Sequence, residues 1–276
     1  MESRGTRLII RMAAYATLAF LYVPLAVVFL YAFNPSRGQS WPLPGLTTHW
    51  FSVAWRNGDV RGALLTSVIA GLGATTIALM LGSAAAFAVH RFRFFGKETV
   101  SFALVLPIAL PGIVTGMALN SAINFGGQIF GLSFGLLTII VGHATFCVVV
   151  VYNNVVARLR RTPGSFVEAS MDLGADGLQT FRYVTLPSIS TALFAGGLLA
   201  FALSFDEIVV TNFTNGTRET LPIWIFKNLR LPNSRPVVNV VAMVVILLSL
   251  VPVYLAQRLT REEGVGLSAR TRETAP

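Results

Sequence analysis

Two adjacent acidic residues, Asp206 and Glu207, directly follow a long run without charged side chains. Carboxylates at membrane depth are costly unless they face water, a cation or a partner group. In a partly dry pathway they would bind ammonium groups through charge-assisted hydrogen bonds. The pair is therefore a candidate contact for a cationic solute. Alternatively, it only marks a helix end, or it pairs with Arg218 or with a partner subunit.

A third candidate for the solute pathway is Trp224, in the segment 221–229 (LPIWIFKNL), where Pro222 can begin a helix. Its aromatic residues, Trp224 and Phe226, could lie at a membrane–water interface as part of an aromatic belt. They could also form a gate against an external binding protein. The pattern favours the belt and leaves the gate open.

The stretch 162–187 (TPGSFVEASMDLGADGLQTFRYVTLP) has the pattern of two short helices joined at a glycine. Thr162 can cap a helix that begins at Pro163, and Ser165 with Glu168 fits a capping box. Gly174 is placed to end that helix in a left-handed conformation. A second helix can start at Asp176 with Gln179 three residues later. Residues at helical spacing along the first helix are Phe166, Ala169, Ser170 and Leu173.

Such a rigid amphipathic projection could transmit the motion of a soluble protein to a membrane bundle. The alternative is an ordinary amphipathic helix that lies in the membrane interface.

No arrangement of side chains predicts covalent chemistry. His143 and the single cysteine, Cys147, stand in apolar runs without a second metal ligand, which indicates a hydrogen-bonded histidine and a buried thiol. The phosphate-binding loop motif is absent, because Gly96-Lys97 lacks the upstream glycine and is followed by Glu98. We therefore expect no catalytic residue, no metal site and no cofactor in this chain, so that any ATPase must be another protein.

The chain is 54% hydrophobic and 12% charged, with a mean hydropathy of +0.68. Soluble domains carry about a quarter charged residues, so part of the surface of this protein must contact lipid. The run Thr99–Ala157 has no charged residue and is too long for one span; its Asn- and Gly-containing part at 120–128 predicts a break. We predict an all-α integral membrane protein with one transmembrane domain over 1–276 and six spans near 12–36, 62–90, 99–119, 132–157, 183–205 and 236–257.

Small residues crowd the second and fifth predicted spans. Glycines 71, 73 and 82 and the alanines 84–86 lie in the second, and Ala195-Gly196-Gly197 lies in the fifth. Faces of this kind predict close helix–helix approach.

The net charge of +9 comes from basic clusters between apolar runs, so it predicts membrane topology and not nucleic-acid binding. With both termini in the cytoplasm, fourteen Lys and Arg residues fall on the inner side and seven on the outer side. The inner set comprises Arg4, Arg7, Arg11, Arg91, Arg93, Lys97, Arg158, Arg160, Arg161, Arg182, Arg258, Arg261, Arg270 and Arg272.

The chain resembles a known family over nearly its whole length. Glu168-Ala169-Ser170, Gly174, and Val184-x-Leu186-Pro187 after a spacer of nine residues are similar to the EAA signature of bacterial ABC importer permeases, with Ser170 in place of the usual alanine. Further motifs resemble polyamine permeases and also occur in related permeases for other solutes: Tyr22-Val-Pro-Leu, Tyr31-Ala-Phe-Asn, Leu106-Pro-x-x-x-Pro-Gly, Leu203-Ser-Phe-Asp-Glu and Leu221-Pro-Ile-Trp-Ile-Phe.

The resemblance implies a type I importer permease bundle in the bacterial inner membrane, whose loop 162–187 docks on an ATP-binding subunit as a coupling helix. Its implied partners are a homologous permease subunit, two ATP-binding subunits that bind ATP and Mg, an external solute-binding protein and membrane lipid. Its implied activity is alternating-access import of a polyamine such as spermidine or putrescine; the rival reading is a secondary transporter or channel without an ATPase. The implied coupling residues are Glu168, Ala169, Ser170, Leu173, Gly174, Leu186 and Pro187.

Overall fold

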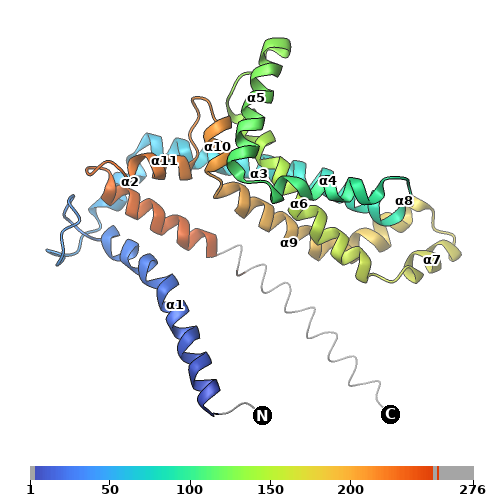
Figure 1. The fold of residues 1–276 in the computed structure, drawn as a ribbon, viewed down its shortest axis with the longest axis horizontal. Coiled ribbons are helices and arrows are strands. Elements are labelled where there is room, and N and C mark those ends of the chain that lie inside the picture. The colour runs from blue at the N-terminus through green and yellow to red at the C-terminus, as the bar shows by residue number, and fades with distance from the viewer. Residues whose placement is uncertain (1–3, 251–253, 255–276) are drawn as a thin grey trace. The chain divides into compact units, whose positions relative to one another are not determined.

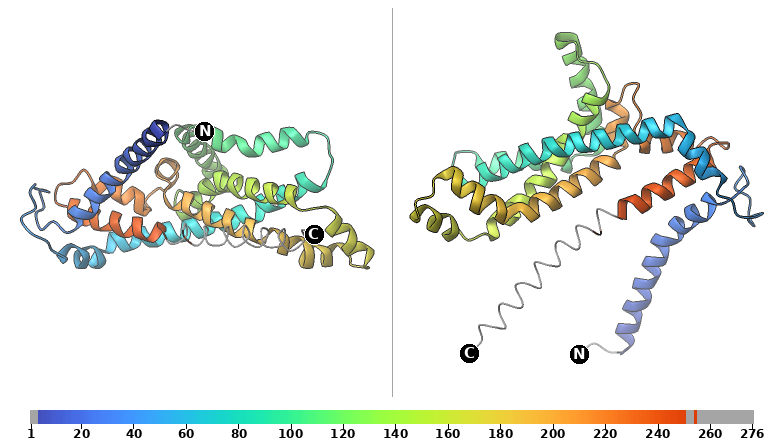
Figure 2. Two further views of the ribbon diagram at one scale, coloured as in Figure 1. Left: turned by 90° about the horizontal axis from the view of Figure 1, so that it is seen from below. Right: turned by 180° about the vertical axis from the view of Figure 1, so that it is seen from behind.

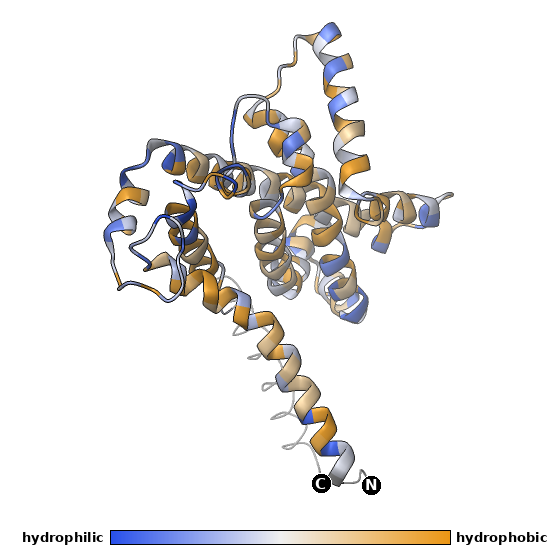
Figure 3. Ribbon diagram, turned by 60° about the vertical axis from the view of Figure 1, so that its left-hand side comes forward, coloured by the Kyte–Doolittle hydropathy of each residue, from blue (hydrophilic) through white to orange (hydrophobic). Residues whose placement is uncertain are grey.

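The computed structural model describes residues 4–250 and 254, and every regular element in this part is a helix (Figure 1). Two compact units are present, one of residues up to 61 together with 224–248 and one of residues 62–223. The predicted all-helical membrane class is confirmed by this architecture and by the apolar helices that Figure 3 shows.

The first unit contains α1 (Arg4–Ala32), α2 (His49–Arg56) and a helix over Arg235–Leu250. The segment that connects α1 to α2 folds around Asn34, which is fully buried. The Asn34 amide donates to the carbonyl of Ser40 at 3.2 Å and accepts from the backbone N–H of Ser36 at 2.8 Å. The Trp50 indole donates to the Asn34 carbonyl at 2.9 Å. These bonds satisfy polar groups that burial would otherwise leave unpaired.

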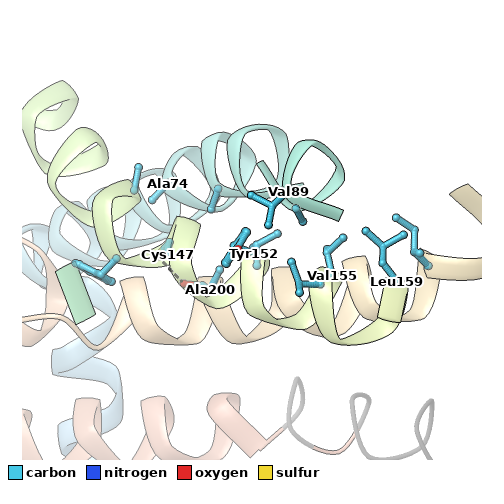
Figure 4. Close-up of a cluster of buried hydrophobic side chains, with 14 of the residues drawn as sticks. Ala74, Val89, Cys147, Tyr152, Val155, Leu159 and Ala200 are labelled. Carbon is cyan, nitrogen blue, oxygen red and sulfur yellow. Dashed lines mark hydrogen bonds between the residues drawn. The ribbon is translucent and has the colours of Figure 1, made fainter. Parts of the chain in front are cut away.

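The second unit is organised around α6, which is flanked by α9, α4 and α10 (Figures 1 and 2). Its apolar core joins Ala74 and Val89 to Tyr152, Val155 and other residues of α6 (Figure 4). The elements are α3 (Gly58–Arg91), α4 (Lys97–Ala109), α5 (Gly112–Phe130), α6 (Leu136–Arg161), α7 (Ser165–Asp172), α8 (Gly177–Thr180), the π-helical turn η1 (Phe181–Thr185), α9 (Leu186–Phe205) and α10 (Val209–Thr214). The first four residues of α3 belong to the first unit, and α11 (Leu221–Asn228) has its first three residues in the second unit and the rest in the first.

Glycines 71, 73 and 82 of the second predicted span and the two glycines of the fifth lie at close helix contacts, as the sequence predicts, whereas Ala84 of the second span is exposed. A Cβ added at Gly82 of α3 would lie 2.8 Å from the carbonyl oxygen of Val148 in α6. A Cβ added at Gly196 of α9 would lie 3.5 Å from the Cα of Val151, and Gly197 faces Leu79. Glycine thus allows three long helices to approach backbone to backbone.

We expect Gly82→Ala to lower the amount of folded permease in the membrane. The new methyl group meets main chain, which cannot rotate away, and overpacking of this kind costs about 1–3 kcal/mol. Gly62→Ala on the same helix is the matched control, because nothing lies within 4 Å of a Cβ there. Thermal stability of the two purified variants in detergent measures the difference. Equal stability would show that α3 and α6 do not pack as described.

Four helical segments in the described part are long and apolar enough to cross a membrane: those over Gly5–Ala32, Gly58–Arg91, Leu136–Arg161 and Gly177–Phe205. The bent pair α4 and α5, counted as one span, makes five. The sixth predicted span, 236–257, corresponds to the helix Arg235–Leu250, and most of its remainder lies outside the described residues.

The prediction of a turn at 120–128 is wrong, because these residues lie inside α5. The Asn120 side chain donates to the carbonyl of Phe213 at 2.7 Å, and Asn124 donates to Asn120 at 3.0 Å. These bonds occupy amide groups that would otherwise compete with the helix backbone. The break falls at Leu110-Pro111, where Leu110 is extended, as the residue before a proline prefers, and the two helix axes differ by 104°.

Candidate functional site

The loop 162–187 begins with an extended residue. Thr162 follows the end of α6, and its hydroxyl donates to the carbonyl of Arg158 at 3.2 Å. The helix α7 starts only at Ser165, with Gly164 before it and no capping bond from a side chain. The predicted capping roles of Thr162 and Ser165 are therefore wrong. The Thr162 hydroxyl is instead bonded back to α6, and α7 begins two residues after Pro163.

Gly174 ends α7 as the sequence predicts. Its φ is +85°, and its N–H donates to the carbonyl of Met171 at 2.9 Å. The N–H of Ala175 then donates to the carbonyl of Ser170 at 3.1 Å. A side chain at Gly174 would strain this left-handed conformation.

The predicted start of a second helix at Asp176 is confirmed. Its carboxylate accepts from the backbone N–H groups of Leu178 and Gln179 at 2.9 and 2.8 Å, and the Gln179 side chain accepts from the Asp176 N–H at 2.9 Å. This helix continues through η1 into α9, so that helical backbone runs over Gly177–Phe205. The π-helical turn lies just before Pro187, which lacks an N–H and crowds the preceding turn.

This continuity connects α7 mechanically to a membrane span. The hydroxyl groups of Ser170 in α7 and Thr180 in α8 lie 2.9 Å apart, and Thr180 is buried. The Phe181 ring packs edge-on against Phe87 of α3 at 5.3 Å between ring centroids. Packed side chains thus connect α7 with the helix that continues into α9, and that helix with α3.

Several apolar side chains of the loop have no covering in this chain. Leu173 is 89% exposed, Leu178 75% and Phe166 58%. A cavity of about 410 Å³ lies behind α7, lined by Phe87, His90, Leu159, Val167, Glu168 and Val184 among others. The loop projects from one end of its unit, close to the ends of α3 and α6 (Figure 2). Such exposed apolar side chains on a projecting element are typical of a docking surface.

The seven predicted coupling residues are distributed over this projection. Glu168, Ala169 and Leu173 are exposed, and Gly174 forms the turn after α7. Ser170 is half-buried against Thr180, whereas Leu186 and Pro187 begin α9.

The acidic pair lies at the opposite end of α9, in a turn before α10. Glu207 caps α10, because its carboxylate accepts from the Val210 N–H at 2.9 Å. Asp206, which follows the last residue of the span, is exposed, and burial of part of its carboxyl raises its pKa above the ordinary value. The two carboxylates therefore differ: that of Glu207 caps α10, and that of Asp206 is exposed.

The remaining candidate, Trp224, is only 4% exposed. A buried indole does not lie at a lipid interface, so the aromatic-belt interpretation is wrong for this residue. Phe226 is 50% exposed, with the Arg230 guanidinium 5.0 Å from its ring centroid. Burial was not readable from the sequence, since both residues are aromatic and belong to the same short segment 221–229.

The prediction of a hydrogen-bonded His143 is confirmed, but its partners could not be predicted. The two ring nitrogens of this buried residue each lie 2.7 Å from a hydroxyl, Nδ1 from Ser204 and Nε2 from Thr211. These partners are 61 and 68 residues away in the chain, so no local pattern could indicate them. Among the residues that the structure describes, no group of three or more His, Cys, Asp or Glu could hold a metal ion.

Comparison with known proteins agrees with this arrangement. Residues 78–263 match the family described as binding-protein-dependent transport system inner membrane component. The chain is 34% identical over 253 residues to the spermidine/putrescine transport system permease protein PotC of Escherichia coli strain K12, covering 91% of this chain and 93% of PotC. It is also 34% identical over 232 residues to the putrescine transport system permease protein PotI of the same strain, covering 82% of each chain.

A solved structure of a bacterial ABC transporter involved in alginate import has the same fold, with a TM-score of 0.68, 16% identity, and coverage of 95% of this chain and 98% of that one. The fold, the projecting loop and the sequence similarity thus agree. The chain belongs to the binding-protein-dependent transport system inner membrane components, the non-catalytic permease subunits of ABC importers.

Proposed function

We propose that this permease imports a polyamine such as spermidine or putrescine by alternating access. The relatives PotC and PotI carry these substrates in their names and share 34% identity with this chain. A flexible polycation needs acceptor groups that are not already neutralised. Asp206 offers one, since its side chain is exposed directly after the end of α9. The single observation that carries the proposal is the similarity to PotC over 91% of the chain.

The exposed apolar surface of the loop 162–187 supports docking of an ATP-binding subunit. Two such subunits, binding ATP and Mg, would engage this loop and its counterpart in a homologous permease partner. An external solute-binding protein would deliver the cargo. Helix α1, which is exposed along most of its length, is covered in this proposal by lipid and by the partner permease.

The basic residues support an orientation with both termini in the cytoplasm. Arg91 ends α3, Arg158, Arg160 and Arg161 lie in the last turn of α6, and both helix ends lie on the side of the unit that carries α7 (Figure 1). An excess of Lys and Arg marks cytoplasmic segments. The same side would then face the ATP-binding subunits.

Cargo-stimulated ATP hydrolysis by the complex in proteoliposomes tests the proposed function. We expect the polyamine-loaded binding protein to raise the ATPase rate and to give ATP-dependent uptake of radiolabelled spermidine or putrescine. A neutral sugar and a dicarboxylate serve as control cargoes, because neither offers ammonium groups to a carboxylate. Uptake of polyamine without nucleotide would contradict the ATP-driven mechanism. Stimulation by an anionic cargo alone would contradict the substrate assignment.

A further inference from the structure

Three groups around His143 fix where its protons lie. The hydroxyl oxygen of Thr211 is 2.7 Å from Nε2 of His143 and 2.6 Å from the main-chain carbonyl oxygen of Glu207. A carbonyl oxygen only accepts hydrogen bonds, so the single hydroxyl hydrogen of Thr211 points to Glu207. The Thr211 oxygen must then accept from His143, which places the imidazole hydrogen on Nε2.

The hydrogen-bonding role of Nδ1 follows from the hydrogen on Nε2. A neutral imidazole with a hydrogen on Nε2 has a lone pair on Nδ1. Ser204, whose hydroxyl oxygen lies 2.7 Å away, therefore donates to Nδ1. The other tautomer would leave the Thr211 and Glu207 oxygens 2.6 Å apart with no hydrogen between them. One proton arrangement of the neutral ring thus satisfies every group in the cluster.

The partners of His143 enclose the acidic turn. Ser204 lies two residues before Asp206 near the end of α9, and Thr211 lies in α10, after the turn. Both are buried, at 3% and 0% exposure. Their bonds hold each side of the turn against one residue of α6, and the bond from Thr211 fixes the Glu207 carbonyl. The direction of the Asp206 side chain depends on this turn.

We infer that His143 is a positioning residue, whose Nε2–H tautomer holds the Asp206–Glu207 turn in the geometry that presents the Asp206 carboxylate to the transport pathway. This inference rests on the proposed role of Asp206 in binding a cationic solute. His143 itself does not contact the solute. The hydrogen bonds of His143 act through geometry, because a displaced Asp206 carboxylate binds the solute less well even though the carboxylate itself is unchanged.

Substitutions at His143 should change the apparent affinity for the cargo. We expect His143→Leu to raise KM for polyamine uptake about tenfold, the effect of about one lost hydrogen bond to a charged group, while the complex still assembles. His143→Gln should restore part of the affinity, since its amide carries a donor and an acceptor. Thr211→Val should raise KM similarly, and combining it with His143→Leu should add little.

A matched control lies one helical turn away. Cys147 of α6 is buried, and its thiol donates to the Ala200 carbonyl of α9 at 3.3 Å, so its hydrogen bond joins the same two helices at a residue before the turn. Cys147→Ala should leave KM unchanged. It also removes the only cysteine of the chain, which allows a thiol to be introduced at position 206 as a probe.

The rate at which a charged methanethiosulfonate reagent labels Asp206→Cys, in the Cys147→Ala background, reports the position of the turn without any transport. We expect His143→Leu to change this rate at least about threefold, because the turn is no longer fixed on both sides. If His143→Leu prevents assembly, the labelling rates of His143→Gln and Ser204→Ala provide the same comparison. An unchanged labelling rate in all assembled variants would overturn the positioning role of His143.

Asp206→Asn separates this inference from the proposed function. If Asp206→Asn leaves uptake unchanged but His143→Leu alters labelling at position 206, the positioning holds and the substrate contact is wrong. If Asp206→Asn lowers uptake but neither labelling nor KM responds to His143→Leu, the substrate contact holds and the inference is wrong. If the substrate contact and the positioning role are both right, Asp206→Asn lowers uptake and His143→Leu alters labelling at position 206. His143→Leu should then have no further effect on KM in the Asp206→Asn background.

Discussion

Leu173→Asp abolishes ATP-driven uptake in our account and leaves the permease folded. The side chain is 89% exposed and follows the last residue of α7, so replacing it removes little packing within the described part of the chain. In the assembled importer the same position would be covered by an ATP-binding subunit. Placing an unpaired carboxylate in an apolar interface costs several kcal/mol, so we expect uptake to fall at least about 100-fold.

Two measurements separate loss of docking from loss of folding. The variant should elute as a monodisperse permease but no longer co-purify with the ATP-binding subunit. Leu173→Met should retain uptake, because it keeps apolar volume. Phe95→Asp, at an exposed apolar residue in the α3–α4 connection, should have a smaller effect. Full uptake by Leu173→Asp would show that this residue lies outside the interface.

Asp206→Asn has the second large effect that we expect. The substitution keeps the size of the side chain but removes its charge, and a hydrogen bond to a charged group is worth roughly 1.5–3 kcal/mol. The apparent affinity for polyamine should therefore fall roughly 10- to 100-fold, measured as KM in proteoliposomes at saturating ATP. Assembly with the ATP-binding subunit should be unaffected, since the loop 162–187 lies at the opposite end of α9.

Two controls test whether the effect belongs to this carboxylate. Asp59→Asn removes a negative charge in the first turn of α3, which the Lys and Arg distribution also places outside, and it should leave KM unchanged. Glu207→Gln keeps an acceptor for the Val210 N–H and should have a smaller effect than Asp206→Asn. An equal fall in affinity for all three variants would indicate a general effect of charge on the outer face, and not a solute contact at Asp206.

Local backbone chemistry was the part of the site that the sequence predicted best. Gly174 and the capping box at Asp176 depend only on neighbouring residues, and both appear as expected. The family assignment followed from residues in the same loop, and the comparison with known permeases confirms it. The membrane class followed from hydropathy, because lipid requires long apolar helices.

Interactions between distant segments could not be predicted. The helix α5 continues through Asn120 because the side chain finds a partner in α10, 93 residues later. The burial of Trp224 and the two hydroxyl partners of His143 likewise depend on tertiary packing. The capping role given to Thr162 is wrong because its hydroxyl bonds to the carbonyl of Arg158 at the end of α6, while α7 begins only at Ser165.

Cross-linking from position 173 tests the central claim most directly, that the loop 162–187 receives the force of an ATP-hydrolysing subunit. Leu173→Cys in the Cys147→Ala background gives a chain with a single thiol at the end of α7. We predict that a short bismaleimide joins this thiol to the ATP-binding subunit in membranes, and that an impermeant thiol reagent added to intact cells does not reach it. Labelling from outside, or efficient solute transport by the permease alone, would contradict the account.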